Sequence, residues 1–285
     1  MSRSVLSLPP ARTLVRRASA VARYVLIVLA AASMVVPFLW MISTSLKAPG
    51  SVLTVPPEII PKAPTLESYR RVAETIPILR MAANSLFVTV TTVALQVTTC
   101  AFSAYAFARM RWRGRDALFI VYLATLMVPA QVTITPLFIL IKELGWNNSY
   151  QALILPAATS AFGTFLLRQA MISIPREYEE AAFLDGATHW TVFRTIVVPM
   201  SRTSLATLAV FAAMGAWNDF LWPLIVLKDP DKMTLPVGLS LLQGRYTNDW
   251  NMIMAGAVIS VVPIVLAFIA AQRTFVNGMV SSGLK

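Results

Sequence analysis

Residues 180–199 read EAAFLDGATHWTVFRTIVVP, a polar stretch between two long apolar runs of the chain. Around it, residues 173–203 predict two short helices joined by a turn. Gly186 suits the left-handed position that ends a helix, because glycine has no Cβ to oppose a positive φ. Thr188 can cap the second helix, and we expect Pro199 to end it, because proline lacks an N–H. The pattern predicts a compact loop on an otherwise apolar body.

The composition of the 285-residue chain is that of a membrane protein. Hydrophobic residues make up 57% of it and charged residues 13%, whereas soluble domains carry about 25% charged residues. Six apolar runs are long enough to span a bilayer. Because lipid cannot satisfy free backbone polar groups, we expect an all-α membrane protein with six transmembrane helices. The runs cover residues 24–45, 81–108, 117–141, 150–172, 204–227 and 252–271.

The arginines predict the orientation of these helices. Arginine occupies positions 109, 111, 113 and 115 in the short turn between the second and third runs. By the positive-inside rule, this turn and both termini are cytoplasmic. The first run contains a small-residue triplet at 30–32, as a cleaved signal peptide would. It continues well past that triplet, which favours an uncleaved anchor.

This orientation divides the chain into three parts. We expect a basic cytoplasmic segment at 1–23, a membrane domain at 24–272 and a cytoplasmic tail at 273–285. Large outside loops would cover about 47–80 and 228–251, and the 173–203 loop would be cytoplasmic. The outside loops suit contact with a partner protein, or they are plain connectors. Residues 239–242 predict a short helix at the membrane surface.

The sequence also argues against several function classes. The net charge is +11, but the basic residues form no stripe with interleaved aromatics, so we expect no nucleic-acid partner. No G-x-x-x-x-G-K-[ST] motif occurs, which argues against ATP binding by this chain. No cluster of histidine, cysteine and carboxylates has metal spacing, so no metal site and no catalytic residue is predicted. Cys100 lies inside an apolar run, and we expect it to be a small residue that faces lipid or packs between helices. His189 has no evident partner and suits the loop surface.

The 180–199 stretch resembles the cytoplasmic loop of ABC-importer permeases. It has E-A-A, then glycine after three intervening residues, isoleucine after nine more, and proline three positions beyond. The whole chain resembles the sugar-importer branch that contains the smaller permease of the maltose system. Further matches are STSLK at 43–47, PTLESY at 64–69, NS at 84–85, WNDFLWP at 217–223 and QRTFV at 272–276 followed by Gly278. The departures are small: Ser68 replaces Asn, Val198 replaces Leu, and the chain ends in Gly283-Leu284-Lys285.

The resemblance implies a type I ABC-importer permease fold in a bacterial inner membrane. It implies four kinds of partner: membrane lipid, a homologous second permease, two ATPase subunits that hold ATP and Mg, and an extracytoplasmic substrate-binding protein. This chain itself would carry no cofactor and would not be an enzyme. The residues implied to dock the ATPase are Glu180, Ala181, Ala182, Asp185, Gly186, Ile196 and Pro199.

One ionisable side chain, Asp219, lies in the middle of an apolar run. Such residues are costly in a membrane and usually face a cavity or a partner. Asn218 and Gln96 are polar candidates for the same pathway, and the rings of Trp217 and Trp222 could stack on sugar faces. The alternative is that Asp219 stabilises a helix break or pairs with the second permease.

The transported substrate remains open between two classes. A sugar or oligosaccharide is expected from the resemblance, and glycerol-3-phosphate or a glycerophosphodiester is the alternative. An ion-coupled secondary transporter would predict an inverted internal repeat, which the sequence does not show. An intramembrane enzyme would need convergent catalytic side chains at membrane depth, where Asp219 stands alone.

Overall fold

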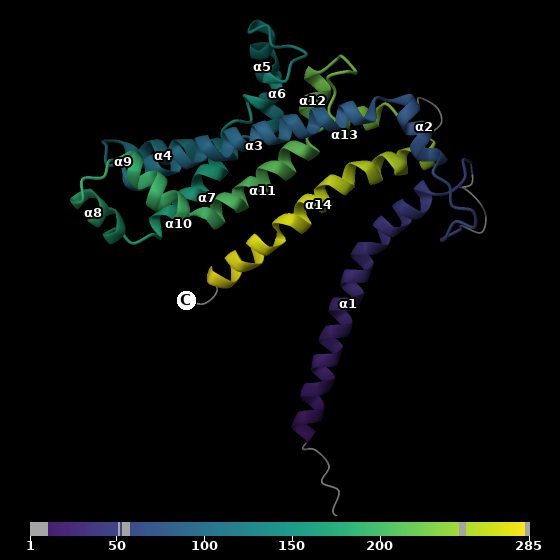
Figure 1. The fold of residues 1–285 in the computed structure, drawn as a ribbon, viewed down its shortest axis with the longest axis horizontal. Helices are drawn as coiled ribbons and strands as arrows, with labels where there is room; N and C mark the ends of the chain where they lie inside the picture. The colour runs from purple at the N-terminus through teal and green to yellow at the C-terminus, as the bar shows by residue number, and fades with distance from the viewer. Residues whose placement is uncertain (1–10, 51, 53–57, 245–248, 283–285) are drawn as a thin grey trace, which may run out of the picture. The chain divides into compact units, whose positions relative to one another are not determined.

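The computed structural model describes residues 11–50, 52, 58–244 and 249–282, with the side chains of 11–18 and 270–282 outside that description. In this part of the chain every regular element is a helix, as the all-α prediction expects (Figure 1). The helices are α1 (Ala11–Ser45), α2 (Glu67–Thr75), α3 (Ile78–Arg109), α4 (Arg115–Ala124), η1 (Thr125–Met127), α5 (Ala130–Glu143), α6 (Gln151–Ile154), α7 (Ala161–Ile172), α8 (Glu177–Leu184), α9 (His189–Val192), η2 (Phe193–Val197), α10 (Val198–Met200), α11 (Arg202–Asn218), α12 (Leu221–Val226), α13 (Leu235–Ser240) and α14 (Trp250–Ser282).

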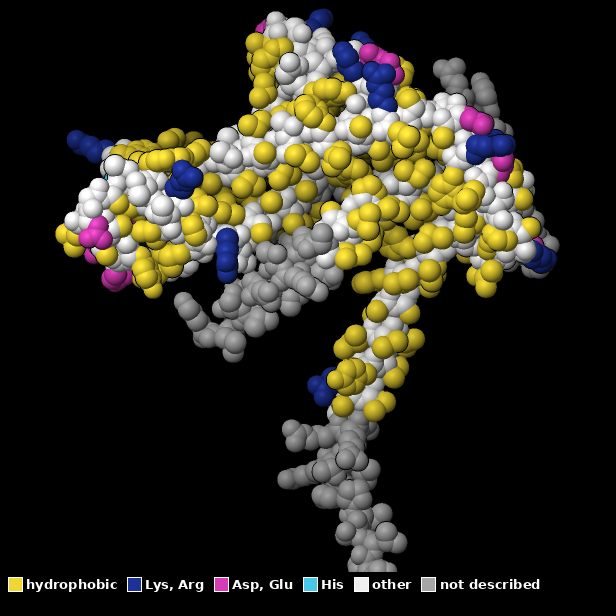
Figure 2. All heavy atoms as spheres, viewed as in Figure 1, with side chains coloured by type: hydrophobic (Ala, Val, Ile, Leu, Met, Phe, Trp, Pro, Cys, Tyr) yellow, Lys and Arg dark blue, Asp and Glu magenta, His cyan; other side chains and the backbone are white. Residues whose placement is uncertain are grey.

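Several of these helices are long and apolar enough to cross a membrane. Among the described residues they are Ser19–Ser45, Ile78–Arg109 and Trp250–Ile269, or five spans if two bent pairs each count as one. Segments Arg115–Met127 and Ala130–Glu143 meet at 99°, and the pair His189–Met200 and Arg202–Asn218 meets at 77°. Exposed hydrophobic side chains follow one another along the described part of α1, from Val21 to Ile42 (Figure 2). The chain is therefore a multi-pass membrane protein.

The prediction of one helix per apolar run is wrong for the third, fourth and fifth runs. The third breaks before Pro129, the fourth is non-helical at 155–160, and the fifth breaks at Asp219. A proline lies at or near each break: Pro129, Pro156 and Pro223. The proline ring clashes with the carbonyl four residues earlier, and its nitrogen has no hydrogen to donate to that carbonyl. For Pro223 that earlier residue is Asp219. Prolines in α1, α5 and α14 stay within continuous helices.

Side chains from neighbouring helices satisfy backbone groups around these breaks. The Thr99 hydroxyl donates to the Ala158 carbonyl at 2.5 Å. The Trp222 indole N–H donates to the Ala152 carbonyl at 2.8 Å. Irregular backbone at membrane depth is tolerated where protein groups provide such partners. The breaks are therefore built into the bundle.

The chain divides into two compact units, residues 1–70 with 249–258 and residues 71–248 with 259–285. In the first unit, α14 is held to the end of α1. The Asn251 side-chain amide donates to the carbonyls of Thr44 and Lys47, both at 3.1 Å. The Lys47 ammonium is buried and lies 4.7 Å from the centre of the Trp40 ring.

The second unit is built on α3, which packs against α7 and α11. Small residues permit the close approach, as is usual between membrane helices. A Cβ on Gly163 would lie 2.8 Å from Leu208 Cδ1 and 3.0 Å from Cys100 Sγ. Cys100 is fully buried in this core, so its predicted packing role is confirmed.

The segment after α12 is fixed to the start of α3. The Asn84 side-chain amide donates to the carbonyls of Asp231 and Met233 at 2.9 and 3.0 Å. The Ser85 hydroxyl accepts from the backbone N–H of Leu235 at 2.7 Å. These bonds give the Asn84-Ser85 pair a structural role. The short helix predicted at 239–242 begins earlier, because α13 starts where Ser85 holds the chain.

Candidate functional site

The 173–203 loop folds into two short helical arms, as predicted. The first is α8, with three glutamates in its first turn, where the partial positive charge of a helix N-terminus favours them. The second arm runs through α9, a π-helical turn (η2) and α10, and ends at Met200, one residue beyond Pro199. The α8–α10 segment lies at one end of α3 and α13 lies toward the other (Figure 1).

The turn between the arms has the geometry of a glycine-ended helix. Gly186 has a φ of +82°, and the N–H of Ala187 donates to the Ala182 carbonyl at 2.9 Å, the long bond of a Schellman motif. Thr188 then caps the second arm, because its hydroxyl accepts from the N–H of Thr191 at 3.2 Å. Both sequence predictions for this turn are confirmed.

Most residues expected to dock a partner are exposed on these arms. The exposed ones are Glu180, Ala181, Asp185, Gly186 and Pro199, and the half-buried ones are Ala182 and Ile196. Ala182 packs on the hydrophobic core, which anchors the first arm from within. The loop therefore presents acidic and small residues outward.

A buried ion pair ties the first arm to α3. Arg109 Nε lies 2.7 Å from Glu179 Oε1, and the two side chains are 4% and 8% exposed. Arg109 Nη2 also donates to the carbonyls of Met171 and Ile174, each at 2.7 Å. Burial raises the pKa of Glu179 above its ordinary value of 4.5, and Arg109 and Arg176 oppose that rise without cancelling it. One guanidinium thus holds α3, the end of α7 and α8 together.

The second arm is tied to α3 through His189. Its Nδ1 lies 3.1 Å from the Tyr105 hydroxyl, and its ring meets the Phe183 ring edge-on at 5.0 Å. His189 is exposed as predicted, but the prediction that it has no partner is wrong. No local pattern in the sequence indicates this pair, because Tyr105 lies far from His189 along the chain, inside an apolar run.

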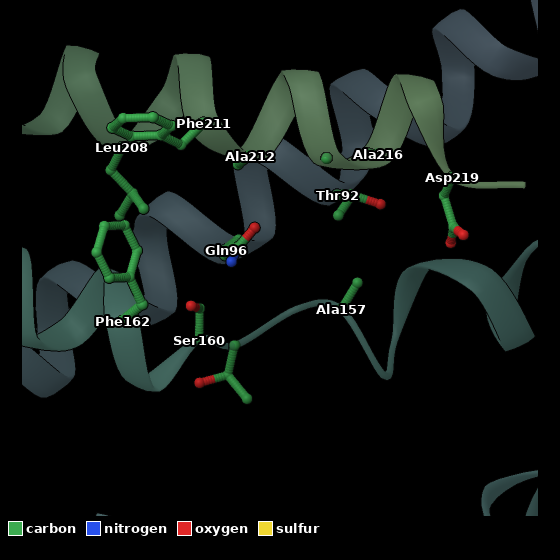
Figure 3. Close-up of a pocket in the computed structure, with 12 residues that line it drawn as sticks. Thr92, Gln96, Ala157, Ser160, Phe162, Leu208, Phe211, Ala212, Ala216 and Asp219 are labelled. Atoms are coloured by element: carbon green, nitrogen blue, oxygen red, sulfur yellow. The ribbon is translucent and has the colours of Figure 1, made fainter. Parts of the chain in front are cut away.

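A hollow of about 340 Å³ lies between α3, α11 and the non-helical segment 155–160 (Figure 3). Phe162 and Phe211 lie at one end and Asp219 at the other, with Gln96 between them. The two phenylalanine rings meet edge-on with their centres 6.0 Å apart. Of the predicted pathway residues, Asp219 and Gln96 are therefore brought together.

Hydroxyl groups extend the polar lining of the hollow. Thr92, Thr159 and Ser160 all line it. The Thr159 hydroxyl pairs with Tyr122 at 3.0 Å, and Ser160 caps α7. Within the described chain, the buried Thr92 hydroxyl has no hydrogen-bond partner. No lysine or arginine occurs among the described lining residues. Carboxylate, amide and hydroxyl groups therefore line the hollow beside two aromatic rings.

Other residues from the predicted pathway lie elsewhere. The Asn218 side chain is exposed, does not line the hollow, and donates to the Met214 carbonyl one turn back at 2.8 Å. Trp217 is buried and donates to the Ser260 carbonyl at 3.2 Å. Trp222 donates to a carbonyl of α6, so neither tryptophan offers a stacking face in the hollow. Phe162 and Phe211 provide its aromatic surface, which the sequence did not single out.

Asp219 has a second role at the helix break. It adopts extended backbone angles, with φ of −66° and ψ of 120°, and its carboxylate accepts a hydrogen bond from the backbone N–H of Trp222. It therefore helps to start α12 while it also lines the hollow. Of the alternatives drawn from the sequence, the helix break describes this residue, and a role in lining the pathway stays a prediction.

Residues 75–280 match the family described as binding-protein-dependent transport system inner membrane component, and this chain belongs to that family. Its members are transport permeases and not catalytic enzymes. This membership argues against the ion-coupled secondary transporter and the intramembrane enzyme that the sequence left open.

Relatives in this family carry several substrate names. The chain is 38% identical to the arabinooligosaccharides transport system permease protein AraQ of Halalkalibacterium halodurans, over 71% of this chain and 72% of that protein. It is 32% identical to the lactose transport system permease protein LacG of Rhizobium radiobacter, over 95% and 98% of the two chains. It is 34% identical to the sn-glycerol-3-phosphate transport system permease protein UgpE of Salmonella typhi, over 81% and 85%.

A solved structure shares the fold. A chain of a bacterial ABC transporter involved in the import of the acidic polysaccharide alginate superposes with a TM-score of 0.83 at 22% identity, over 95% of this chain and 100% of that one. A chain from a bacterial alginate ABC transporter bound to its pentasaccharide-loaded periplasmic protein gives a TM-score of 0.60. The fold is that of an ABC-importer permease.

Proposed function

We propose that this chain is one of two permease subunits in an ATP-driven, binding-protein-dependent importer of a sugar or oligosaccharide. It forms half of the translocation pathway, and a homologous second permease forms the other half. Two separate ATPase subunits bind ATP and Mg, and an extracytoplasmic binding protein delivers the substrate. The relatives named for arabinooligosaccharide and lactose transport support this assembly and the sugar class.

The proposed topology has six transmembrane helices with both termini and the 173–203 loop in the cytoplasm. In this arrangement the fourth span includes α6, the non-helical segment 155–160 and α7. Single cysteines introduced into the 228–251 loop and the 173–203 loop, in a Cys100→Ala background, test it. A membrane-impermeant maleimide added to intact spheroplasts should label the first and not the second. The reverse pattern would refute the orientation.

The ATPase is proposed to dock on the exposed residues of the 173–203 loop, with Glu180, Ala181, Asp185 and Gly186 at the contact. Short helices that present small residues can enter a groove closely. The loop also rests on the core through Ala182, so a force applied to α8 reaches the helices behind it.

The observation that carries the substrate class is the lining of the hollow. Asp219 and Gln96 offer hydrogen bonds to hydroxyl groups, and two phenylalanine rings offer apolar contact, as sugar sites do. A phosphate would need a cationic partner from the second permease. Glycerol-3-phosphate or a glycerophosphodiester is the second candidate, favoured by the 34% identity to UgpE.

The deciding experiment is purification of the whole assembly from its native membrane in mild detergent, with mass spectrometry of what accompanies this chain. We expect a second permease, an ATPase and an exported binding protein. That binding protein is then screened by thermal shift against arabinooligosaccharides, lactose and glycerol-3-phosphate. A shift with glycerol-3-phosphate alone would overturn the sugar class, and recovery of this chain without an ATPase would overturn the importer.

A further inference from the structure

Both arms of the 173–203 loop are attached to one face of α3. Tyr105 and Arg109 are four residues apart, so they are neighbours one turn apart on the helix surface. Tyr105 meets His189 of the second arm at 3.1 Å, and Arg109 meets Glu179 of the first arm at 2.7 Å. The loop is therefore fixed to a single helix at two points.

That helix also reaches the hollow and the far end of the unit. α3 is an unbroken helix of 32 residues without proline or glycine. Thr92 and Gln96 of α3 line the hollow. Gln96 lies about 20 Å from Arg109 along the axis, at 1.5 Å per residue. The third, fourth and fifth apolar runs are all broken, so α3 is the stiff element that joins loop and hollow.

We infer that Arg109 is a positioning residue that locks the 173–203 loop to α3, so that a displacement of α8 moves the wall of the hollow. The inference rests on the proposed function, because the displacement would come from the docked ATPase. The ion pair suits this role: breaking a buried pair leaves an uncompensated charge, so the pair resists separation under load. The Arg109 bonds to Met171 and Ile174 carry the end of α7 along with it.

Arg168 provides a matched control at the same end of the bundle. Its Nε donates to the Phe107 carbonyl at 3.2 Å, and its guanidinium lies 4.2 Å from the centre of the Phe119 ring. It also approaches Asp116 at 3.7 Å. In the described part of the chain, none of these partners belongs to the 173–203 loop. Its removal should weaken the bundle without releasing the loop.

The test uses the purified importer with its ATPase, a Cys100→Ala background and a cysteine at Ala157 in the hollow. The rate of maleimide labelling is measured before and after trapping with ATP and vanadate. With Arg109 intact, we expect trapping to change the rate by about fivefold or more, the scale of a typical coupling energy. In Arg109→Gln and Glu179→Gln the change should disappear while ATP hydrolysis continues. Arg168→Gln should retain the change.

The outcomes separate the two proposals. If trapping leaves the rate unchanged with Arg109 intact, the wall of the hollow does not follow the ATPase and the tether is refuted, whereas the importer itself fails only if no ATPase accompanies this chain. If the rate changes equally in Arg109→Gln, the tether is refuted and the importer stands. Loss of the ATPase from both Arg109→Gln and Glu179→Gln on purification would also refute the tether, because the pair would then serve assembly and not transmission.

Discussion

At Gly186, substitutions can separate the effect of backbone strain from the effect of contact with a partner surface. Its φ of +82° strains any side chain, but a Cβ there would meet nothing within 4 Å among the described residues. Any loss of function from a larger residue must therefore come from backbone strain or from a partner surface. Gly145, with φ of +70° and equally open surroundings, is a control in another turn.

We expect Gly186→Asn to abolish substrate uptake, because asparagine tolerates the left-handed conformation but adds a side chain where the ATPase would pack. Gly145→Asn should leave uptake within about twofold, since its cost in backbone strain is of the same order as at Gly186, about 1–2 kcal/mol. Both are measured in proteoliposomes after protein levels are matched. Normal uptake by Gly186→Asn would remove the docking interpretation.

Asp219 combines a helix-starting hydrogen bond with a place in the hollow, and two substitutions separate these roles. Asparagine keeps an oxygen that can accept from the Trp222 N–H, so Asp219→Asn should unfold within a few degrees of the parent protein. Uptake should fall about tenfold, because hydrogen bonds to charged groups contribute about 1.5–3 kcal/mol. Asp219→Ala should lose uptake and also about 1 kcal/mol of stability through the lost cap. Parental uptake by Asp219→Asn would show that its charge has no role in transport.

At this scale the sequence predicts local geometry well and long-range pairs poorly. Gly186 and Thr188 were found because their roles depend on neighbours in the chain. Arg109 looked like an orientation marker at the end of an apolar run, and Glu179 like one of three glutamates in a helix turn. Their pairing depends on the packing of α3 against the loop, and no local pattern encodes it.

Among the elements, α13 shows how a short helix can be fixed by close packing. A Cβ on Gly238 would lie 2.1 Å from Met81 Sδ of α3, which is far inside van der Waals contact. Gly215 of α11 is a second helical glycine, and there a Cβ would meet nothing within 4 Å in the described structure. Gly238 is therefore a glycine with no room for a side chain, and Gly215 is a helical glycine with open space around it.

Gly238→Val should lower stability by about 1–3 kcal/mol, the usual cost of overpacking a buried site. It should also expose the segment 228–244 to protease, because α13 would separate from α3. Gly215→Val carries the same β-branched side chain in open space and should cost less than the Gly238 variant. Thermal unfolding and limited proteolysis in detergent measure both effects. Equal stability of the two variants would contradict the packing of α13 on α3.

The existence of the long helices was predicted where composition alone controls it, but two of their boundaries were not. The helices α1, α3 and α14 contain the first, second and sixth apolar runs, because long apolar runs in lipid have few alternatives. However, α1 begins at Ala11 and α14 ends at Ser282, both well outside their runs. The third, fourth and fifth runs carry prolines too, but Pro37 and Pro263 show that a proline does not always break a helix. At the break in the fourth run, Thr99 and Trp222 satisfy the carbonyls of Ala158 and Ala152, and these long-range contacts have no local pattern in the sequence.

For the whole molecule, the family and the class of function follow from the sequence because they rest on a motif with fixed spacing. The site in the hollow does not follow so directly. Gln96 and Asp219 were chosen as polar residues in apolar runs, which is a sound rule. Phe162 and Phe211 are ordinary apolar residues by that rule, and only the break at 155–160 brings them beside the polar groups.

The proposed division of labour makes a prediction about the isolated chain. It contains no G-x-x-x-x-G-K-[ST] motif, the loop that cradles nucleotide phosphates. Purified alone in detergent, it should therefore show no heat of Mg-ATP binding and no phosphate release above buffer. Hydrolysis should appear only when the ATPase subunits are added. The Gly186→Asn chain should retain less of the added ATPase on purification than the parent chain does. Hydrolysis by the chain alone would mean that energy conversion does not depend on a partner, and the exposed 173–203 loop would then need another explanation.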